Sequence, residues 1–274
     1  LMIGVGLVGF ITVFAASAKT SIAGSLDTEF VGTHIVQAGG YDNSTGLSPA
    51  IAHTLRSSPG VDTVAQARMS PAIVDGSATD AFFAFDATTI DDVFTLGQVE
   101  GDLDSLGTDG IAVSAERAED TGWTIGSTVP VTFPSGDAVF VVRAIYSDGT
   151  DWVGSEFVDL QGLRANGGDD LDYRVYVAGD AEAIEVATAR YASAEVLDKD
   201  AFLDSVSGEI DAILGLFYAM LALAVVIALT AAMWARRASR RGRGALDAST
   251  YMRIILPETV IAIGDHRATL RADH

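Results

Sequence analysis

Two long uncharged apolar stretches constrain this chain more than any other feature of its sequence. They span Leu1–Ala18 and Ile213–Ala235 and lie on either side of an acidic region at residues 19–212. As a helix at about 1.5 Å per residue, the second stretch is about 34 Å long, enough to cross a hydrocarbon layer of about 30 Å. The first stretch is about 27 Å long by the same rise. We therefore predict transmembrane helices at residues 1–18 and 213–235.

The distribution of charge predicts on which side of the membrane the middle region lies. Residues 19–212 contain 33 acidic and 9 basic side chains, in a chain whose net charge is −20. Five basic residues directly follow the second apolar stretch, namely Arg236, Arg237, Arg240, Arg241 and Arg243. Such a cluster is typical of a cytoplasmic end, so residues 236–274 are predicted to form a basic cytoplasmic tail. Because two spans return the chain to the side it left, residues 19–212 are expected to form an extracytoplasmic domain of a multi-pass protein of the plasma membrane.

The first apolar stretch has a second interpretation, as a signal peptide. Ala16-Ser17-Ala18 resembles the small-residue site at which such peptides are cleaved. No basic segment precedes the stretch and the chain opens with Leu1, which favours a transmembrane helix whose natural beginning is missing. The stretch also contains the G-x-G-x-x-G spacing of dinucleotide-binding loops, at Gly4, Gly6 and Gly9. Within a lipid-embedded helix, small residues are instead expected to let neighbouring helices approach closely.

Both predicted spans continue into the domain as amphipathic helices. After the first span, apolar residues recur at helical spacing at Ile22, Leu26 and Phe30. Before the second span, the same spacing occurs at Phe202, Val206, Ile210 and Ile213 or Leu214. Two interpretations stay open. The helices could be stalks that pack against each other and carry displacement between membrane and domain, or membrane-proximal helices that pack on the domain.

The region between these helices has the pattern of an α+β domain that contains strand–helix–strand units. The first unit is predicted as a strand at 31–38, a loop at 39–46, a helix from Ser48-Pro49 to about Arg56 and a strand at 61–67. The second is predicted as a strand at 173–178, a helix at 181–191 and a strand at 194–197. The two units are alike in pattern but not in residues, which suggests a pseudo-repeat.

The chain between the two units predicts a subdomain that contains a β-hairpin. Residues 128–133 and 138–146 alternate around Pro134-Ser135-Gly136-Asp137, the pattern of a hairpin. A strand at 111–113 is followed by Ser114, which is expected to cap a helix that ends at Gly122. The remaining predictions are a short strand at 82–85, a helical turn at 89–94 and an acidic loop at 97–110.

The order of these patterns resembles a known family of membrane proteins. Residues 110–133 read GIAVSAERAEDTGWTIGSTVPVTF, and residues 140–146 read FVVRAIY. In this order, a strand, a short helix closed by Gly, an apolar-Gly-Ser-x-Val step and a hairpin resemble the extracytoplasmic core of MacB-like and FtsX-like ABC transporter permeases. The helices at 1–21 and 214–229 resemble those that open and close such a unit, so the resemblance covers about residues 1–230.

The resemblance implies a subunit that is not an enzyme. The sequence itself contains no catalytic, P-loop or metal-binding motif, so no catalytic, cofactor-binding or metal-binding residues are predicted. Permeases of this family pair as homodimers or with a second permease half, lie in membrane lipid and bind a separate cytoplasmic ABC ATPase. Closure of the ATPase on ATP moves the membrane helices and displaces the extracytoplasmic domain. Family members use this movement for export or for processes in the cell envelope. No nucleic-acid partner is expected, in agreement with the negative charge of the domain.

The tail departs from the family pattern. Family members carry a coupling segment and two further membrane helices after the closing span, whereas here an Arg/Gly-rich string follows Ala235. The apolar residues 254–263 are too few to span a membrane and contain Pro257. We therefore expect a truncated or frame-altered product. A divergent two-span protein and a shortened partner subunit are the alternatives.

Residues that could support chemistry are sparse. His34 and His53 lie in the predicted domain, whereas His266 and His274 lie in the tail. Two acidic clusters could hold Ca²⁺ but lack EF-hand spacing, and solvated loops are expected instead, at Asp102/Asp104/Asp109 and Asp169/Asp170/Asp172. Trp123 and Trp152 could be core or contact residues. The alternative to a permease is a membrane-anchored extracytoplasmic binding or sensor domain without an ATPase, and an anchored hydrolase is a third possibility.

Overall fold

A computed structural model describes residues 2–39, 46–148 and 150–241, which divide into two compact units at Leu214 and Gly215. The first unit contains a mixed α/β domain built on one ten-stranded sheet, with strand order β10-β1-β9-β2-β3-β8-β5-β7-β4 and with β6 paired to β2 and β7. The α+β class expected for residues 19–212 is therefore confirmed.

One end of the sheet is made from the two predicted strand–helix–strand units. The first consists of β1 (His34–Ala38), α2 (Ala50–Arg56) and β2 (Val61–Val74), and the second of β9 (Arg174–Gly179), α7 (Ala181–Thr188) and β10 (Ala194–Asp198). The units interleave, because β1 lies between β10 and β9, and β9 lies between β1 and β2, with every pair antiparallel. This is the split β-α-β arrangement, in which neither unit forms its part of the sheet alone.

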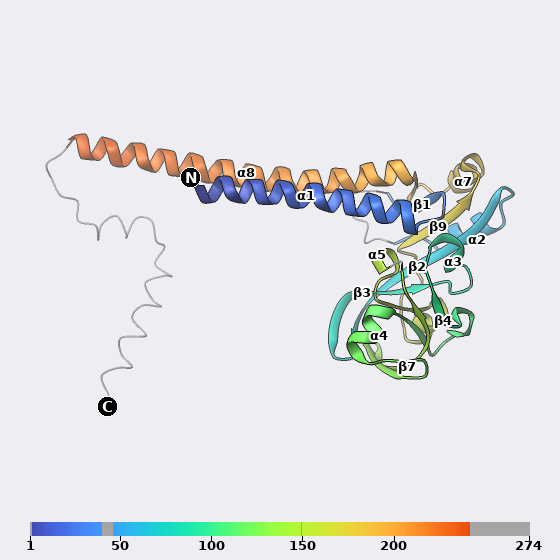
Figure 1. Cartoon of the computed structure of the whole chain (residues 1–274). Helices are drawn as coiled ribbons and strands as arrows, with labels where there is room; N and C mark the ends of the chain where they lie inside the picture. Colours follow the sequence, from blue (N-terminus) through green and yellow to red (C-terminus); the bar gives the residue numbers. More distant parts are fainter. Residues whose placement is uncertain (1, 40–45, 149, 242–274) are drawn as a thin grey trace, which may run out of the picture. The chain divides into compact units, whose positions relative to one another are not determined.

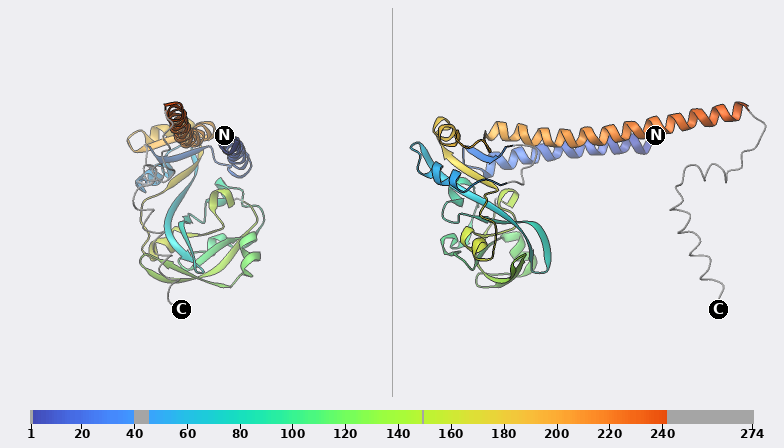
Figure 2. Two further views of the ribbon diagram at one scale, coloured as in Figure 1. Left: turned by 90° about the vertical axis from the view of Figure 1, so that its left-hand side faces the viewer. Right: turned by 180° about the vertical axis from the view of Figure 1, so that it is seen from behind.

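Side chains on this end of the sheet alternate between two apolar clusters, as the pleat of a strand requires. The cluster beneath α2 and α7 includes Val36, Val64, Val175, Ile51 and Ile184. The next residues along the strands, Ile35, Ala65 and Tyr176, belong to a second cluster on the opposite face. Figures 1 and 2 show α2 and α7 beside β1, β9 and β2. The opposite face is therefore the one left for the ends of the long helices.

The middle of the chain closes a small barrel onto the second half of β2. Its further strands are β3 (Ser77–Phe85), β5 (Gly110–Ser114), β6 (Thr128–Phe133), β7 (Gly136–Tyr146) and β8 (Glu156–Asp159). The pairings run from β2 to β3, β8, β5, β7 and β6, and return from β6 to β2 where Val74 faces Val131. The interior is a separate apolar cluster in which Phe133 makes edge contacts with Phe82 and Phe140.

Local sequence patterns correctly predicted the positions of most of these elements. The hairpin is formed by β6 and β7, and Ser114 caps α4 (Ala115–Thr121), which ends at Gly122 in the left-handed conformation. Helix α3 (Ile90–Val93) occupies the predicted turn. The predicted acidic loop at 97–110 instead contains β4 (Val99–Gly101) and a 3₁₀ turn (Leu103–Ser105). Three further elements were not predicted, namely α5 (Thr150–Val153), β8 and α6 (Leu160–Ala165).

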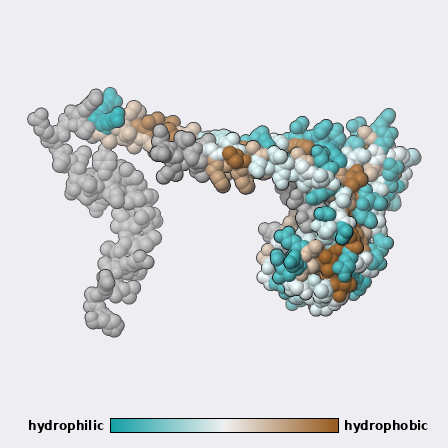
Figure 3. Space-filling model, viewed as in Figure 1, coloured by the Kyte–Doolittle hydropathy of each residue, from teal (hydrophilic) through white to brown (hydrophobic). Residues whose placement is uncertain are grey.

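Two long helices lead to and from the domain, α1 (Met2–Glu29) and α8 (Lys199–Arg241). Among the residues that the structure describes, only α8 is long and apolar enough to cross a membrane, over a window within Lys199–Arg237. Apolar surface along α8 and a hydrophilic group near the C-terminal end of this helix are visible in Figure 3. The helix passes the predicted end of the span at Ala235 without a break. The span predicted at residues 1–18 stays a prediction, and residues 242–274 of the predicted tail lie outside the described chain.

Candidate functional site

The candidate site is the junction where the two long helices meet the sheet. We call α1 and residues 199–214 of α8 the stalk helices; these segments and the domain all lie in the first compact unit. Leu26 and Phe30 from α1 and Phe202 from α8 are buried, and all three belong to the cluster on the sheet face opposite α2 and α7. The ends of the predicted stripes nearest the sheet therefore pack on the domain.

Backbone hydrogen bonds fix the end of α1 to the domain. The N–H of Thr95 donates to the carbonyl of Glu29 at 2.7 Å, and the N–H of Val31 donates to the carbonyl of Val93 at 2.9 Å. The N–H of Thr33 reaches the carbonyl of Val177 in β9 at 2.8 Å. The first bond satisfies a carbonyl at the helix terminus that would otherwise lack a partner. The other two attach the segment after α1 to α3 and to the sheet.

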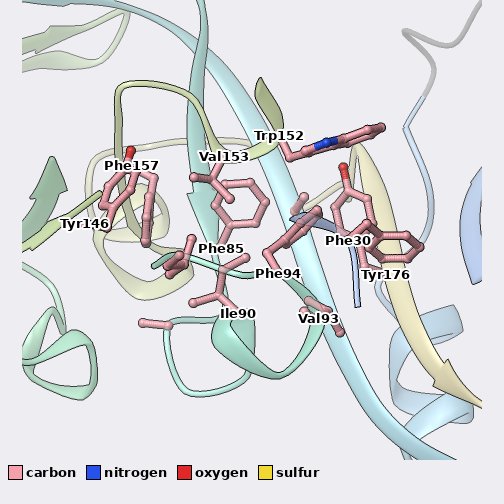
Figure 4. Close-up of a cluster of buried hydrophobic side chains, with 14 of the residues drawn as sticks. Phe30, Phe85, Ile90, Val93, Phe94, Tyr146, Trp152, Val153, Phe157 and Tyr176 are labelled. Carbon is pink, nitrogen blue, oxygen red and sulfur yellow. The ribbon is translucent and has the colours of Figure 1, made fainter. Parts of the chain in front are cut away.

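A series of aromatic rings connects the two stalk helices through the domain, and Figure 4 shows its members Phe30, Tyr176, Phe94 and Trp152. Phe30 lies 5.8 Å from Tyr176, and Tyr176 lies 4.7 Å from Phe94, between ring centroids. Phe94 lies 6.2 Å from Trp152, which in turn lies 5.7 Å from Phe202. These separations are those of favourable aromatic contacts. Burial raises the pKa of the Tyr176 hydroxyl, which keeps this ring neutral within the series.

Two lysines link the stalk helices more directly. At the domain end, Lys199 Nζ donates to the backbone carbonyl of Phe30 at 2.6 Å and lies 5.3 Å from the centre of the Phe30 ring. Farther along the helices, Lys19 Nζ lies 2.6 Å from Asp211 Oδ1. The second pair is partly solvated, so its contribution to stability is small, about 0–1 kcal/mol. Lys199 is therefore the stronger link, because its acceptor is a helix-terminal carbonyl next to a buried ring.

Between these links the stripes flank a cavity and do not interlock. The cavity has a volume of about 380 Å³ and is lined by Ile22 and Ser25 of α1, by Val206 and Glu209 of α8, and by Trp152 and Arg174 of the domain, among others. Close packing of the two stalk helices along their stripes is therefore not what joins them at this level. Both helices instead pack on the domain, and Lys199 and Lys19 connect one helix to the other.

A buried ionic network ties the strands of the domain together and corrects one prediction. Asp172 was expected in a solvated loop, but it is fully buried and accepts hydrogen bonds from Arg68 Nε at 2.8 Å and Gln66 Nε2 at 2.7 Å. Asp170 bonds Arg68 and Arg164, and the pKa of its carboxyl is lowered mainly by the hydrogen bond from Arg164. Burial raises the pKa of Asp172, against the opposing effect of its two hydrogen bonds.

Most of the other singled-out residues have structural partners. Asp102 Oδ1 accepts from the N–H of Asp104, and Asp109 pairs with Arg143 at 2.7 Å. His34 lies in β1, 2.9 Å from the hydroxyl of Thr33, whereas His53 is exposed on α2. Trp123 packs beside the barrel core under Arg117, and Trp152 is a member of the aromatic series. His266 and His274 lie outside the described residues.

Several solved structures are similar to part of this chain, whereas the comparisons by sequence found no match. No protein-family model matches the chain, and no curated protein matches it at a significant level. The periplasmic region of MacB from Actinobacillus actinomycetemcomitans is similar at a TM-score of 0.47 and 13% identity, over 66% of this chain and 95% of that one. The extracellular domain of YknZ, a noncanonic ABC-type transporter from Gram-positive bacteria, is similar at 0.44 and 14%, over 61% and 99%. A domain of a protein described as a permease from Porphyromonas gingivalis is similar at 0.41 and 16%, over 60% and 87%.

Sequence reasoning located the apolar stripes of the junction but not its polar members. Lys199 and Arg174 were not singled out, because each acts on a partner far away in the sequence: Lys199 on Phe30, and Arg174 on the ring of Phe202. The one signal available was the concentration of aromatic residues at positions 82–94, 152–157 and 173–176. A cluster of this kind predicts a core, but it does not indicate which lysine or arginine will border it.

Proposed function

We propose that this chain is, or is part of, the permease subunit of an ABC transporter, in which a partner ATPase moves an extracytoplasmic domain through the stalk helices. The subunit itself catalyses no reaction. It lies in the plasma membrane, contacts lipid along its apolar helices, and pairs as a homodimer or with a second permease half. The movement serves export or a process of the cell envelope.

One observation carries the proposal: both stalk helices end inside the same apolar cluster of the domain. Phe30 and Phe202 are buried there, and Lys199 connects the beginning of α8 to the end of α1. A helix that continues from such an anchor into an apolar segment of membrane-spanning length can transmit a displacement without bending. α8 does so, since it runs unbroken from Lys199 to Arg241.

The test is to break α8 between the anchor and the apolar segment. Ile210 lies in the helix interior, where proline removes a hydrogen bond and kinks the helix at a cost of about 3 kcal/mol or more. In the full-length protein with its ATPase, Ile210→Pro should leave ATPase binding and ATP turnover intact. It should abolish the ATP-dependent change in distance between spin labels placed at Glu119→Cys in two copies of the subunit. Ile210→Ala, which keeps the helix, should behave as the parent does.

An unchanged label displacement in the Ile210→Pro variant would contradict transmission through α8. The alternative function, a membrane-anchored binding or sensor domain, is favoured by the cavity beside the junction. Affinity purification of the full-length protein from its native membrane distinguishes the two functions. Recovery of a stoichiometric ATP-binding subunit supports the permease, and its absence supports the sensor domain.

A further inference from the structure

The outer face of the barrel is apolar along the second half of β2. Met69, Pro71 and Ile73 are exposed there and alternate with buried side chains of the same strand. A sheet face in contact with water normally presents polar side chains. Ile73 is nevertheless 42% exposed, and Val139 on β7 is 61% exposed. The core of the barrel does not account for apolar side chains in these positions.

The neighbouring strands continue this face on both sides of β2. Ile73 lies opposite Ala78 of β3 and opposite Thr132 of β6. Val139 of β7 lies opposite Pro130, which is exposed on β6. Single exposed apolar residues are common on protein surfaces, whereas contiguous ones mark interaction sites. Here they extend over four neighbouring strands, so we interpret this face as a site of interaction.

A groove lies in this face where the pairing of β6 with β2 ends, at Ile73 and Thr132. Its volume is about 290 Å³, and it is lined by residues 71–73 of β2, 78–79 of β3 and 132–134 at the end of β6. Sites for complete small ligands are larger, about 300–1,000 Å³, and use a few polar groups to orient the ligand. This groove is smaller and its lining contains no charged residue. It therefore suits one large apolar side chain of a larger partner, as the central pocket of an interface does.

The face is uncharged in a domain that is otherwise rich in charge. Residues 19–212 contain 33 acidic and 9 basic side chains, whereas residues 69–74, 76–79 and 121–136 contain no charged residue. Carboxylates lie at the border of the face, at Asp75 in the turn between β2 and β3 and at Asp137 in β7, and both residues are exposed. An uncharged centre with a polar rim is the usual composition of a protein–protein interface.

Prolines determine how a partner can bind to this face. Three of the six prolines in the chain belong to it, namely Pro71, Pro130 and Pro134. Pro71 lies at the register shift between Ser70 and Ala72, and it has no N–H to offer an added strand. A partner therefore binds here through its side chains.

The charge of the domain decides which partner fits. A second copy of the chain would bring the same acidic rim to the face, and like charges across an interface repel each other. A partner with basic side chains around an apolar one is instead attracted by the rim and by the negative field of the whole domain. The chemistry of the face thus favours a basic protein surface.

We propose that this face binds a second protein through a loop that carries one large apolar side chain flanked by Lys or Arg. The apolar side chain enters the groove against Ile73 and Phe133, and the basic side chains pair with Asp75 and Asp137. The proposal does not depend on the transport function, because it rests on the barrel alone.

A library of disulfide-closed peptide loops with random sequence tests the proposal. The loops are selected on the full chain in phosphatidylcholine nanodiscs, after depletion on empty nanodiscs. Selected loops should contain an aromatic or aliphatic residue between basic ones. A synthetic loop of this kind should bind at least tenfold more weakly to Ile73→Ser. Val186→Ser is the matched control, because Val186 is exposed on α7 at the other end of the sheet, and it should not change binding.

A second variant separates binding from folding. Asp75→Asn/Asp137→Asn leaves the groove intact, so it should weaken binding of the loop and reduce the dependence of its affinity on salt, while the thermal unfolding temperature stays within a few degrees of the parent. The proposal is overturned if no loop is enriched, if the enriched loops lack basic residues, or if they bind Ile73→Ser as tightly as the parent. Light scattering of the parent and of Ile73→Ser in detergent tests the other occupant. Loss of a dimer in the variant would assign the face to a second copy of the chain and would also overturn the proposal.

Discussion

At the scale of single residues, the ion pair of Arg68 and Asp172 is the feature of the domain whose stability depends most on its hydrogen-bond partners. Both side chains are buried, with exposed fractions of 3% and 0%. Charges in this position are stabilising only while every partner is present, because removal of one leaves the other desolvated. Gln66 and Asp170 complete the set, so the segment 170–172 is fixed against β2 where that strand passes from the split β-α-β sheet into the barrel.

We therefore expect Arg68→Met to destabilise the protein by about 3–5 kcal/mol, since it leaves the buried carboxylate of Asp172 without its guanidinium partner. The measurement is urea unfolding of the full chain in nanodiscs, followed by tryptophan fluorescence. Arg164→Met is the matched control, because it removes an ion pair to Asp170 in which both side chains are more than half exposed. It should cost less than about 1 kcal/mol. Equal losses in the two variants would show that burial does not set the strength of the network.

At the scale of elements, α4 is the helix whose limits are most directly encoded by neighbouring residues. Ser114 Oγ accepts from the N–H of Arg117 at 3.1 Å, and Gly122 adopts φ +74 at the other end. Both signals act within a few residues, so they were legible in the sequence. The same holds for the hairpin of β6 and β7, where alternation and a turn lie side by side.

Replacement of the cap gives a quantitative test of that local encoding. Ser114→Ala removes the hydroxyl oxygen that accepts from the N–H of Arg117, so we expect a loss of about 1 kcal/mol, within the range of about 0.5–2 kcal/mol known for N-caps. Ser57→Ala is the control, since Ser57 follows α2 and its hydroxyl only donates to carbonyls that the helix already presents. A loss below about 0.5 kcal/mol is expected there. If Ser114→Ala lowers the free energy of unfolding no more than Ser57→Ala does, the hydrogen bond from the N–H of Arg117 to Ser114 does not determine where α4 begins.

Elements that depend on distant partners could not be read from the sequence. β8 is four residues long and is defined by its parallel pairing with β3 and its antiparallel pairing with β5, more than 40 residues away on either strand. The burial of Asp172 has the same origin, since it follows from Arg68 and Gln66 on β2. The lysine and arginine of the candidate site likewise depend on contacts across the sheet. Local pattern predicts where elements begin, whereas tertiary contact decides which polar side chains they bury.

At the scale of the whole molecule, the continuity of α8 determines how the chain is oriented. The helix is unbroken from Lys199, which bonds the domain, to Arg241, in the arginine cluster. If its apolar segment crosses a membrane, the domain and the arginines must lie on opposite sides, whether or not residues 1–18 also span. Arginines beside a span remain in the cytoplasm, so the domain is predicted to face outward.

The absence of cysteine from the sequence makes this prediction simple to test. Glu119→Cys places a thiol on the exposed face of α4, and Arg240→Cys places one in the arginine cluster. On intact cells, a membrane-impermeant maleimide should label the first variant and not the second, and permeabilisation should make both reactive. Glu182→Cys on α7 is a control from the other end of the sheet and should behave as Glu119→Cys does. Equal labelling of Glu119→Cys and Arg240→Cys on intact cells would place both ends of α8 in one compartment. A stalk that does not cross the lipid could not connect the domain to a cytoplasmic ATPase, so the permease function would fall with that result.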